Sequence, residues 1–106
     1  NRLLKEKFGS KSPIELSFQS RFGPSSWLRP YTDKTLERLA KEGKKNILII
    51  CPGFSSDCVE TLEEIEMEGQ ETFREHGGEK FSMVPCLNDS NDHINLLEYL
   101  IKKHIV

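Results

Sequence analysis

The fold is decided by the stretch Asn46-Ile47-Leu48-Ile49-Ile50-Cys51-Pro52-Gly53. Its apolar residues follow one another without alternation, which is typical of a central parallel strand that is covered on both faces. Pro52 and Gly53 are turn formers, so they end the strand. We therefore expect a buried strand here, and the segments on either side decide how its sheet is built.

Helices and strands alternate outward from this strand. Upstream, 14–18 alternates apolar and polar residues as a strand does, and a helix runs from Thr32, a typical N-cap residue, to Gly43, a typical C′ residue. Downstream, we expect a long helix from Asp57 to Gly77-Gly78. A short strand then covers 81–84, and Ser90 or Asn91 caps a last helix.

The alternating order predicts an α/β fold with a mostly parallel sheet and right-handed crossovers, arranged as three layers, α/β/α, in a Rossmann- or flavodoxin-like way. Residues 1–106 form a single domain, in which 10–106 are the α/β core. Residues 1–9 are expected to be the end of an upstream helix, because an apolar side begins at Leu3 with no capping residue before it. We therefore expect the chain to be a fragment of a longer protein.

Composition narrows the class of protein. The formal charge of −2 argues against a general nucleic-acid role, and no apolar run approaches the roughly 20 residues of a membrane span. The three cysteines, Cys51, Cys58 and Cys86, are widely spaced and contain no CxxC pair. This favours a reducing compartment, here the cytoplasm, over a disulfide framework or a structural zinc site.

Two segments leave the carboxyl ends of the expected strands, where parallel sheets bind their ligands: 19–27 and 52–60. The first belongs to a loop of about a dozen residues, a length that often signals function. It contains Trp27, the sole tryptophan. Trp27 is either a lid over the edge of the core or a flat wall for a large aromatic ligand.

The second segment has two interpretations. Asp57 followed by Glu60 is a capping box, in which the Asp caps the helix and the Glu reaches back to the cap amide. A stripe of acidic residues extends from it along the helix: Glu60, Glu64, Glu68, Glu71 and Glu75. The stripe is either a solvated face or, at its ligand end, a path for protons or a hard divalent cation.

Cys58 sits at the expected start of this helix, a position where reactive cysteines occur in other proteins. A catalytic cysteine also needs a base, and His76, His93 and His104 all lie at distant helix ends or near the chain end. We interpret His93 as a first-turn surface residue. A Cys–His nucleophile pair is therefore not expected.

These two loops carry a family resemblance. One segment of ferrochelatases is similar in residue types and order to a stretch of this chain: Ser17-Phe18-Gln19-Ser20-Arg21-Phe22-Gly23-Pro24, followed by Trp27-Leu28 and Pro30-Tyr31-Thr32. Phe54-Ser55-Ser56-Asp57-Cys58-Val59-Glu60-Thr61-Leu62-Glu63-Glu64-Ile65 is similar to a second signature of that family. Both motifs are long and occur in the right order, and the similarity runs from about Ile14 to the end of the chain.

The resemblance implies the C-terminal part of a bacterial-type ferrochelatase, a lyase of heme biosynthesis that inserts Fe²⁺ into protoporphyrin IX, and half of a chelatase fold. Glu60 matches the acidic residue assigned to proton removal, holding the macrocycle and metal binding. Asp57 and Glu64 match further acidic catalytic positions along a π-distorted helix. The matching porphyrin-binding positions are Trp27, Gln19, Ser20, Arg21 and Phe54.

The chain departs from the family pattern in two ways. Many members have His at the position of Cys58, which puts a metal role for Cys58 in doubt. The upstream His and the other half of the porphyrin cleft lie outside this chain. The resemblance implies Fe²⁺ as substrate, no permanently bound cofactor and no [2Fe–2S] cluster in this chain. It also implies that the remainder of the ferrochelatase chain is a partner and that peripheral membrane contact is possible.

Two functions therefore stay open. One is a metal chelatase, of which this chain alone is expected to be inactive. The other is a non-catalytic α/β module that binds a tetrapyrrole or a metal.

Overall fold

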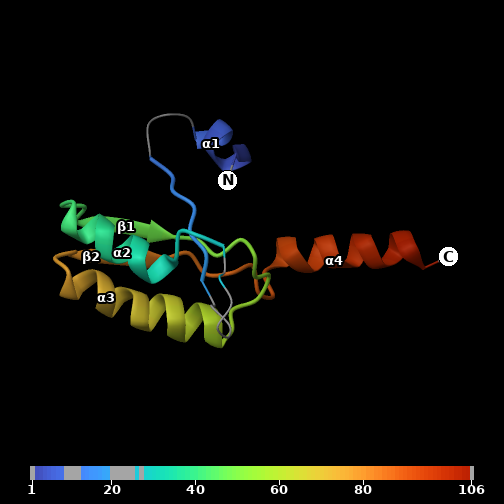
Figure 1. Cartoon of the computed structure of the whole chain (residues 1–106). Helices are drawn as coiled ribbons and strands as arrows, with labels where there is room; N and C mark the ends of the chain where they lie inside the picture. The colour runs from blue at the N-terminus through green and yellow to red at the C-terminus, as the bar shows by residue number, and fades with distance from the viewer. Residues whose placement is uncertain (1, 9–12, 20–25, 27, 106) are drawn as a thin grey trace.

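The computed structural model describes residues 2–8, 13–19, 26 and 28–105 (Figure 1). The elements follow in the order α1 (Arg2–Phe8), α2 (Thr32–Lys41), β1 (Asn46–Ile49), η2 (Glu60–Gly69), α3 (Gln70–Glu75), β2 (Lys80–Met83) and α4 (Asn91–His104). The predicted long helix is thus two elements, because η2 is a π-helix that continues directly into α3. Ten residues of π-helix are unusual, since such helices mostly occur as single turns and often at functional sites.

The two strands pair in parallel, with Ile47 opposite Phe81 and Ile49 opposite Met83. The crossover between them is η2 with α3, as expected of a βαβ unit. The predicted α/β class with a parallel sheet is therefore confirmed. Because the strands run in the same direction, the segments that follow β1 and β2 leave from the same edge of the sheet.

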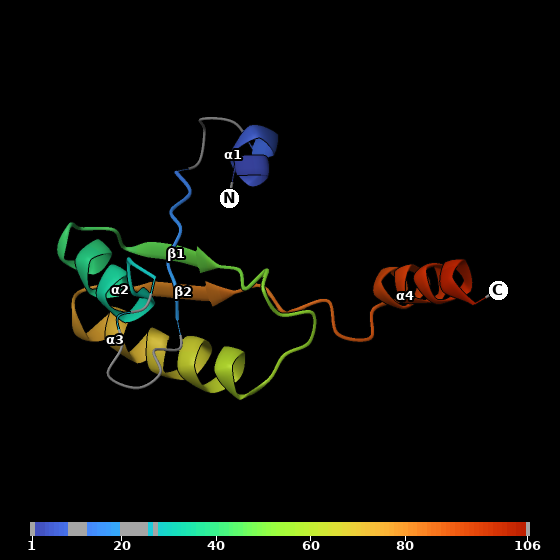
Figure 2. The same cartoon turned by 45° about the vertical axis from the view of Figure 1, so that its right-hand side comes forward.

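The core lies on one side of this sheet. Figures 1 and 2 show α2 and α3 on the same side of the two strands. The buried apolar side chains come from every element of that side: Leu36, Ala40, Ile65, Phe73 and Phe81. Phe73 is fully buried, and its ring centroid lies 6.4 Å from that of Phe81.

The expectation that β1 is covered on both faces is not met among the described residues. Ile47 and Ile49 pack against the core, whereas Leu48 on the opposite face is 67% exposed. The reason is topological, because the helix before β1 and the helix after it both lie against the same face.

The terminal helices lie away from this core. α4 extends beyond the carboxyl ends of the strands, and α1 lies apart from the sheet (Figures 1 and 2). Ser90 is the N-cap of α4, as predicted, and the apolar residues Ile94, Leu97 and Ile101 are exposed along it. Among the helices of the described ranges, none combines the length and apolarity needed to cross a membrane.

The predicted strand at 14–18 reduces to a single bridge. The Phe18 N–H donates to the Pro30 carbonyl (2.9 Å), and the Phe18 carbonyl accepts from the Thr32 N–H (2.9 Å). A longer ladder does not form here because the partner segment turns at once into α2. Thr32 is consequently the first residue of α2 rather than its cap, which is Tyr31, and the Thr32 hydroxyl lies 2.9 Å from that of Ser17.

Glycines mark two helix ends, as the sequence predicts. Gly43 follows α2 with φ of +91°, a left-handed conformation that side chains other than glycine rarely adopt. After α3, Gly77 has the same left-handed conformation with φ of +108°, and Gly78 comes next for a different reason. A Cβ atom built on Gly78 would lie 2.2 Å from ring carbons of Phe73.

We expect Gly78→Ala to lower the free energy of unfolding by about 1–3 kcal/mol, as overpacking does. The added methyl group collides with Phe73, which has no room to move because it is 0% exposed. Gly53→Ala is the matched control, since nothing lies within 4 Å of its Cβ position. Urea denaturation measures both variants, and equal stabilities would contradict this packing.

Candidate active site

A groove of about 590 Å³ lies between η2 on one side and the first turns of α2 with residues 18–19 on the other. One wall consists of Phe18, Gln19, Tyr31, Thr32, Asp33 and Leu36, and the other of Val59, Glu60, Glu63, Glu64, Ile65, Glu68, Gly69 and Thr72. The structure thus brings together Gln19, Glu60 and Glu64 from the two segments that the sequence singles out. Asp57 does not line the groove and lies three residues before the first residue of η2.

The wall formed by η2 is acidic. Glu60, Glu64 and Glu68 of the predicted stripe line the groove, whereas Glu71 is exposed on α3 outside it. Glu63 joins the wall although α-helical spacing does not place it on the stripe. A π-helix closes its hydrogen bonds one residue later than an α-helix, so its residues are distributed differently around the axis. The family resemblance implied this π-distorted helix, whereas the α-helical spacing of the glutamates did not place Glu63 on the acidic wall.

Glu60 is held at both its backbone and its carboxylate. Its carbonyl accepts a hydrogen bond from Gln19 Nε2 at 3.1 Å, which ties the two walls of the groove together. The hydrogen bond from the Cys58 thiol, and then that from its own backbone N–H, lower the pKa of the Glu60 carboxyl. Glu60 is therefore an ionised carboxylate at neutral pH.

Asp57 is enclosed by hydrogen-bond donors. Its Oδ1 accepts from the Thr61 hydroxyl (2.9 Å), and its Oδ2 accepts from Asn88 Nδ2 (2.9 Å) and from the Cys86 N–H (3.2 Å). The Asn88 amide first, and the Thr61 hydroxyl second, lower the pKa of the Asp57 carboxyl. The Asp57 carboxylate thus holds Thr61, Cys86 and Asn88 together and does not line the groove.

The capping-box interpretation of Asp57 and Glu60 is not realised. In such a box, the Glu60 side chain would accept a hydrogen bond from the Asp57 N–H. That N–H donates instead to Asn88 Oδ1 at 2.8 Å. The side chain of Asp57 likewise pairs with Thr61 and Asn88, and the first helical residues have no side-chain cap. A partner 31 residues further along the chain has replaced the local one.

Thr61 is a residue that sequence reasoning missed. It is fully buried, its hydroxyl donates to Asp57 Oδ1, and the same oxygen accepts the Cys58 N–H at 3.0 Å. The signal was present in the sequence, because residues four apart lie next to each other in the first turns of a helix. Thr61 thereby satisfies an amide that the start of η2 would otherwise leave without a partner.

Asn88 was also missed, and His93 was wrongly expected on the surface. His93 is 8% exposed, and its Nδ1 lies 2.5 Å from the Asn88 carbonyl oxygen. The turn after β2 folds the first turn of α4 back onto this carbonyl, which buries the ring. A polar turn residue such as Asn88 gives no sign in the sequence of which distant group it will bind.

The cysteines do not form a reactive centre. Burial first, and then the nearby charge of Asp57, raise the pKa of the Cys51 thiol. Burial and a hydrogen bond to Asp57 raise the pKa of the Cys86 thiol to about 11, so both stay protonated at neutral pH. Within the described part of the chain, no three His, Cys, Asp or Glu side chains converge as metal ligands, so the predicted metal role of Glu60 has no preformed ligand set here.

The remaining predicted site residues divide into two groups. Phe54 is half-buried, donates its N–H to the Cys51 carbonyl at 3.1 Å, and does not line the groove. Ser20, Arg21 and Trp27 lie outside the described residues.

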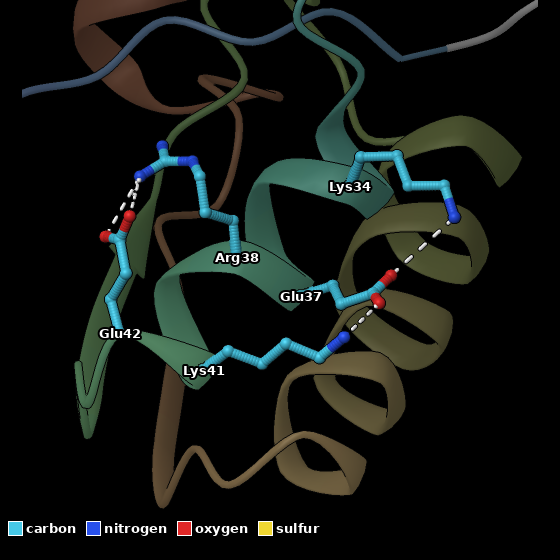
Figure 3. A pocket seen from close by; sticks show the side chains of 5 residues that line it. All are labelled: Lys34, Glu37, Arg38, Lys41 and Glu42. Carbon is cyan, nitrogen blue, oxygen red and sulfur yellow. Dashed lines mark hydrogen bonds and ion pairs between the residues drawn. The ribbon is translucent and has the colours of Figure 1, made fainter.

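A shallower hollow of about 400 Å³ lies on the outer surface of α2 (Figure 3). Its charged side chains pair with one another: Glu37 with Lys41 at 2.7 Å and with Lys34 at 3.6 Å, and Arg38 with Glu42 at 3.0 Å. Such exposed i,i+3 and i,i+4 pairs stabilise a helix surface modestly. Their mutual pairing leaves this hollow without the convergent groups of a binding site.

Comparison with known proteins gives a consistent result. Residues 1–105 match the family model described as Ferrochelatase. The chain is 56% identical to a ferrochelatase of Allorhizobium ampelinum and 53% identical to one of Rhizobium johnstonii, over 105 residues that cover 98% of this chain in each case. A ferrochelatase of Rhodopseudomonas palustris is 50% identical over 103 residues, or 96% of the chain. The chain spans about 30% of the length of these curated relatives.

We expect Thr61→Val to lower the free energy of unfolding by about 1–3 kcal/mol, because the isosteric side chain leaves the half-buried Cys58 N–H and Asp57 Oδ1 without this partner. Thr61→Ser keeps the hydroxyl and serves as the control. Thermal unfolding measures both variants. A valine variant as stable as the serine variant would show that the hydroxyl does not hold the start of η2.

Proposed function

This chain belongs to the ferrochelatase family, and we propose that it forms part of the active site of an enzyme that inserts ferrous iron into protoporphyrin IX to give protoheme and two protons. The observation that carries the proposal is the acidic wall of η2, in which Glu60 stands at the end of the groove nearest the carboxyl ends of the strands. Ferrous iron is a substrate in this proposal, and the cytoplasm is the proposed location.

The chemistry requires a group that accepts protons from the two pyrrole nitrogens as the metal enters. Glu60 suits this role because it is ionised at neutral pH and lines the groove. A flat hydrophobic ligand that covered the groove would remove water from the carboxylate, and desolvation raises the pKa of a carboxyl. Binding of the porphyrin would therefore make Glu60 a stronger base at the moment when protons have to leave.

The neighbouring glutamates give those protons a route to solvent. Glu63, Glu64 and Glu68 follow Glu60 along the same wall, and all three are exposed. Carboxylate oxygens are also the ligands that hard divalent cations prefer. We propose that Glu64 passes protons or the metal along this wall, and that Asp57 acts by fixing the start of η2.

Both walls of this groove belong to one side of the proposed porphyrin cleft, and we propose that the remaining length of such an enzyme supplies the opposite side. The groove of this chain is open, with Gln19 on the side opposite Glu60. Trp27, Ser20, Arg21 and Phe54 stay proposed porphyrin-binding residues on the strength of the family resemblance. Peripheral contact with a membrane is a further proposal for the whole enzyme.

The alternative is a module that binds a tetrapyrrole or a metal without chemistry. The two are distinguished by measuring iron insertion with the whole protein and with this chain alone. Insertion by the whole protein supports the enzyme. Porphyrin binding by the whole protein without insertion favours the binding module.

Glu60→Gln in the whole protein is expected to lower kcat for iron insertion by at least about 100-fold, because the amide keeps the size of the side chain but accepts no proton. Circular dichroism should show an unchanged fold. The matched control is Glu71→Gln, an exposed glutamate outside the groove, which should keep normal turnover. Normal turnover by Glu60→Gln would mean that Glu60 is not the base.

Cys58→Ser is expected to change turnover by no more than about threefold, because a hydroxyl still donates to the Glu60 carboxylate. Cys58→Ala removes that donor, so the pKa of Glu60 should rise toward its ordinary value and the acid limb of the pH–rate profile should move to higher pH. A loss in Cys58→Ser as large as that in Glu60→Gln would instead give the thiol a chemical role of its own.

A further inference from the structure

Two loops from the same edge of the sheet meet at Asp57, just before η2. One follows β1 and contains 50–58, and the other follows β2 and contains 84–90. They are joined by hydrogen bonds of Asn88, and none of the expected catalytic residues belongs to the second loop. The second loop thus has a structural connection to the active site but no assigned part in the reaction.

Asn88 uses all four of its polar groups in this connection. Its side chain brackets Asp57: Oδ1 accepts the Asp57 N–H at 2.8 Å, and Nδ2 donates to Asp57 Oδ2 at 2.9 Å. Its backbone N–H donates to the Ser55 carbonyl at 2.9 Å. Its carbonyl oxygen lies 2.5 Å from Nδ1 of the buried His93. The asparagine therefore makes three hydrogen bonds to the first loop and one to α4.

The backbone of Asn88 is adapted to this geometry. Its φ is +50°, and among the described residues it is the non-glycine residue with a positive φ. Asparagine tolerates this left-handed conformation better than most side chains do. The conformation aims the side-chain amide at Asp57 while the carbonyl faces His93, so the fold holds a local backbone arrangement of higher energy at this position.

The effect of Asn88 reaches Glu60 through Asp57. The Thr61 hydroxyl donates to the Asp57 carboxylate, and the same hydroxyl oxygen accepts the Cys58 N–H. Thr61, which follows Glu60, is thus fixed to Asp57, and Cys58, two residues before Glu60, is fixed to Thr61. Gln19 fixes the Glu60 carbonyl from the opposite wall. Without the two side-chain hydrogen bonds from Asn88 to Asp57, the start of η2 would be held by its local hydrogen bonds, by the Cys86 N–H on Asp57 and by Gln19 on the Glu60 carbonyl.

We propose that Asn88 is a positioning residue for iron insertion, which holds Asp57 and thereby sets the position of Glu60 in the groove. The inference rests on the proposed function for its effect on turnover. Asn88 itself does not line the groove. It acts through the hydrogen bonds of the start of η2.

The test is Asn88→Gly in the whole protein, because glycine adopts the positive φ without strain and only the side-chain amide is lost. We expect kcat for iron insertion to fall about 10- to 100-fold, as small displacements of catalytic groups do, while KM for porphyrin and for ferrous iron stays within about twofold. Asp89→Gly, the exposed neighbour in the same turn, is the control and should keep the wild-type kcat. A purely structural role would reduce the amount of folded enzyme and leave kcat per folded molecule unchanged.

Asn88→Asp is the second variant, in case the glycine variant does not fold. It keeps the acceptor for the Asp57 N–H but sets a second carboxylate against Asp57 Oδ2, where like charges repel. We expect its kcat to be at least as low as that of Asn88→Gly. A wild-type kcat in either folded variant would overturn the proposal.

Hydrogen exchange separates this inference from the proposed function. The Asp57 amide donates to the Asn88 side chain, and the Cys86 amide donates to the Asp57 carboxylate that Asn88 holds. Both amides should exchange with solvent at least about tenfold faster in Asn88→Gly. If the wild-type whole protein inserts no iron, the proposed function fails and exchange alone decides whether Asn88 holds Asp57. Unchanged protection of both amides would overturn the proposal whatever the activity.

Discussion

The parallel pairing of β1 with β2 is the constraint on which the rest of the structure depends. Because Ile47 pairs with Phe81 and Ile49 with Met83 in the same direction, the two following loops leave from one edge of the sheet. Asp57 of the first loop then meets Cys86 and Asn88 of the second. An antiparallel pair would send these loops to opposite ends, and the polar cluster at the foot of η2 would not exist.

The crossover between these strands decides what the groove presents. Thr61, Ile65 and Gly69 are the buried residues of η2, and Gly69 lets the helix approach closely, since a Cβ there would lie 3.2 Å from Leu36 and 3.3 Å from Phe81. Because these three buried residues face the core, the acidic residues on the adjacent face of η2 line the groove. Packing of apolar and small side chains thereby orients the charged wall.

Asp57 shows how a residue type can be identified while its partners are not. Local rules predict that an Asp before a helix binds an amide near its own position. In the folded chain, its carboxylate is shared between the neighbouring Thr61 and two donors about 30 residues away. Buried polar groups need satisfied hydrogen bonds, so this cluster makes the geometry of the site depend on the turn after β2. The buried His93 extends that dependence into α4.

The sequence by itself determined the order and parallel direction of the main elements, the glycine ends of the helices, and that Gln19 and Glu60 belong to segments that meet at the groove. These features are local, since they follow from hydrophobic periodicity, turn residues and long motifs. The family resemblance implied a π-distorted helix, which η2 confirms. Only the tertiary structure decided that Glu63 lines the acidic wall, that the strand at 14–18 shrinks to one bridge, and that Asn88 replaces Glu60 as the partner of the Asp57 amide. Each of these depends on contacts between residues far apart in the chain. Such contacts are chosen by packing and by the satisfaction of buried hydrogen bonds, and no local pattern records them.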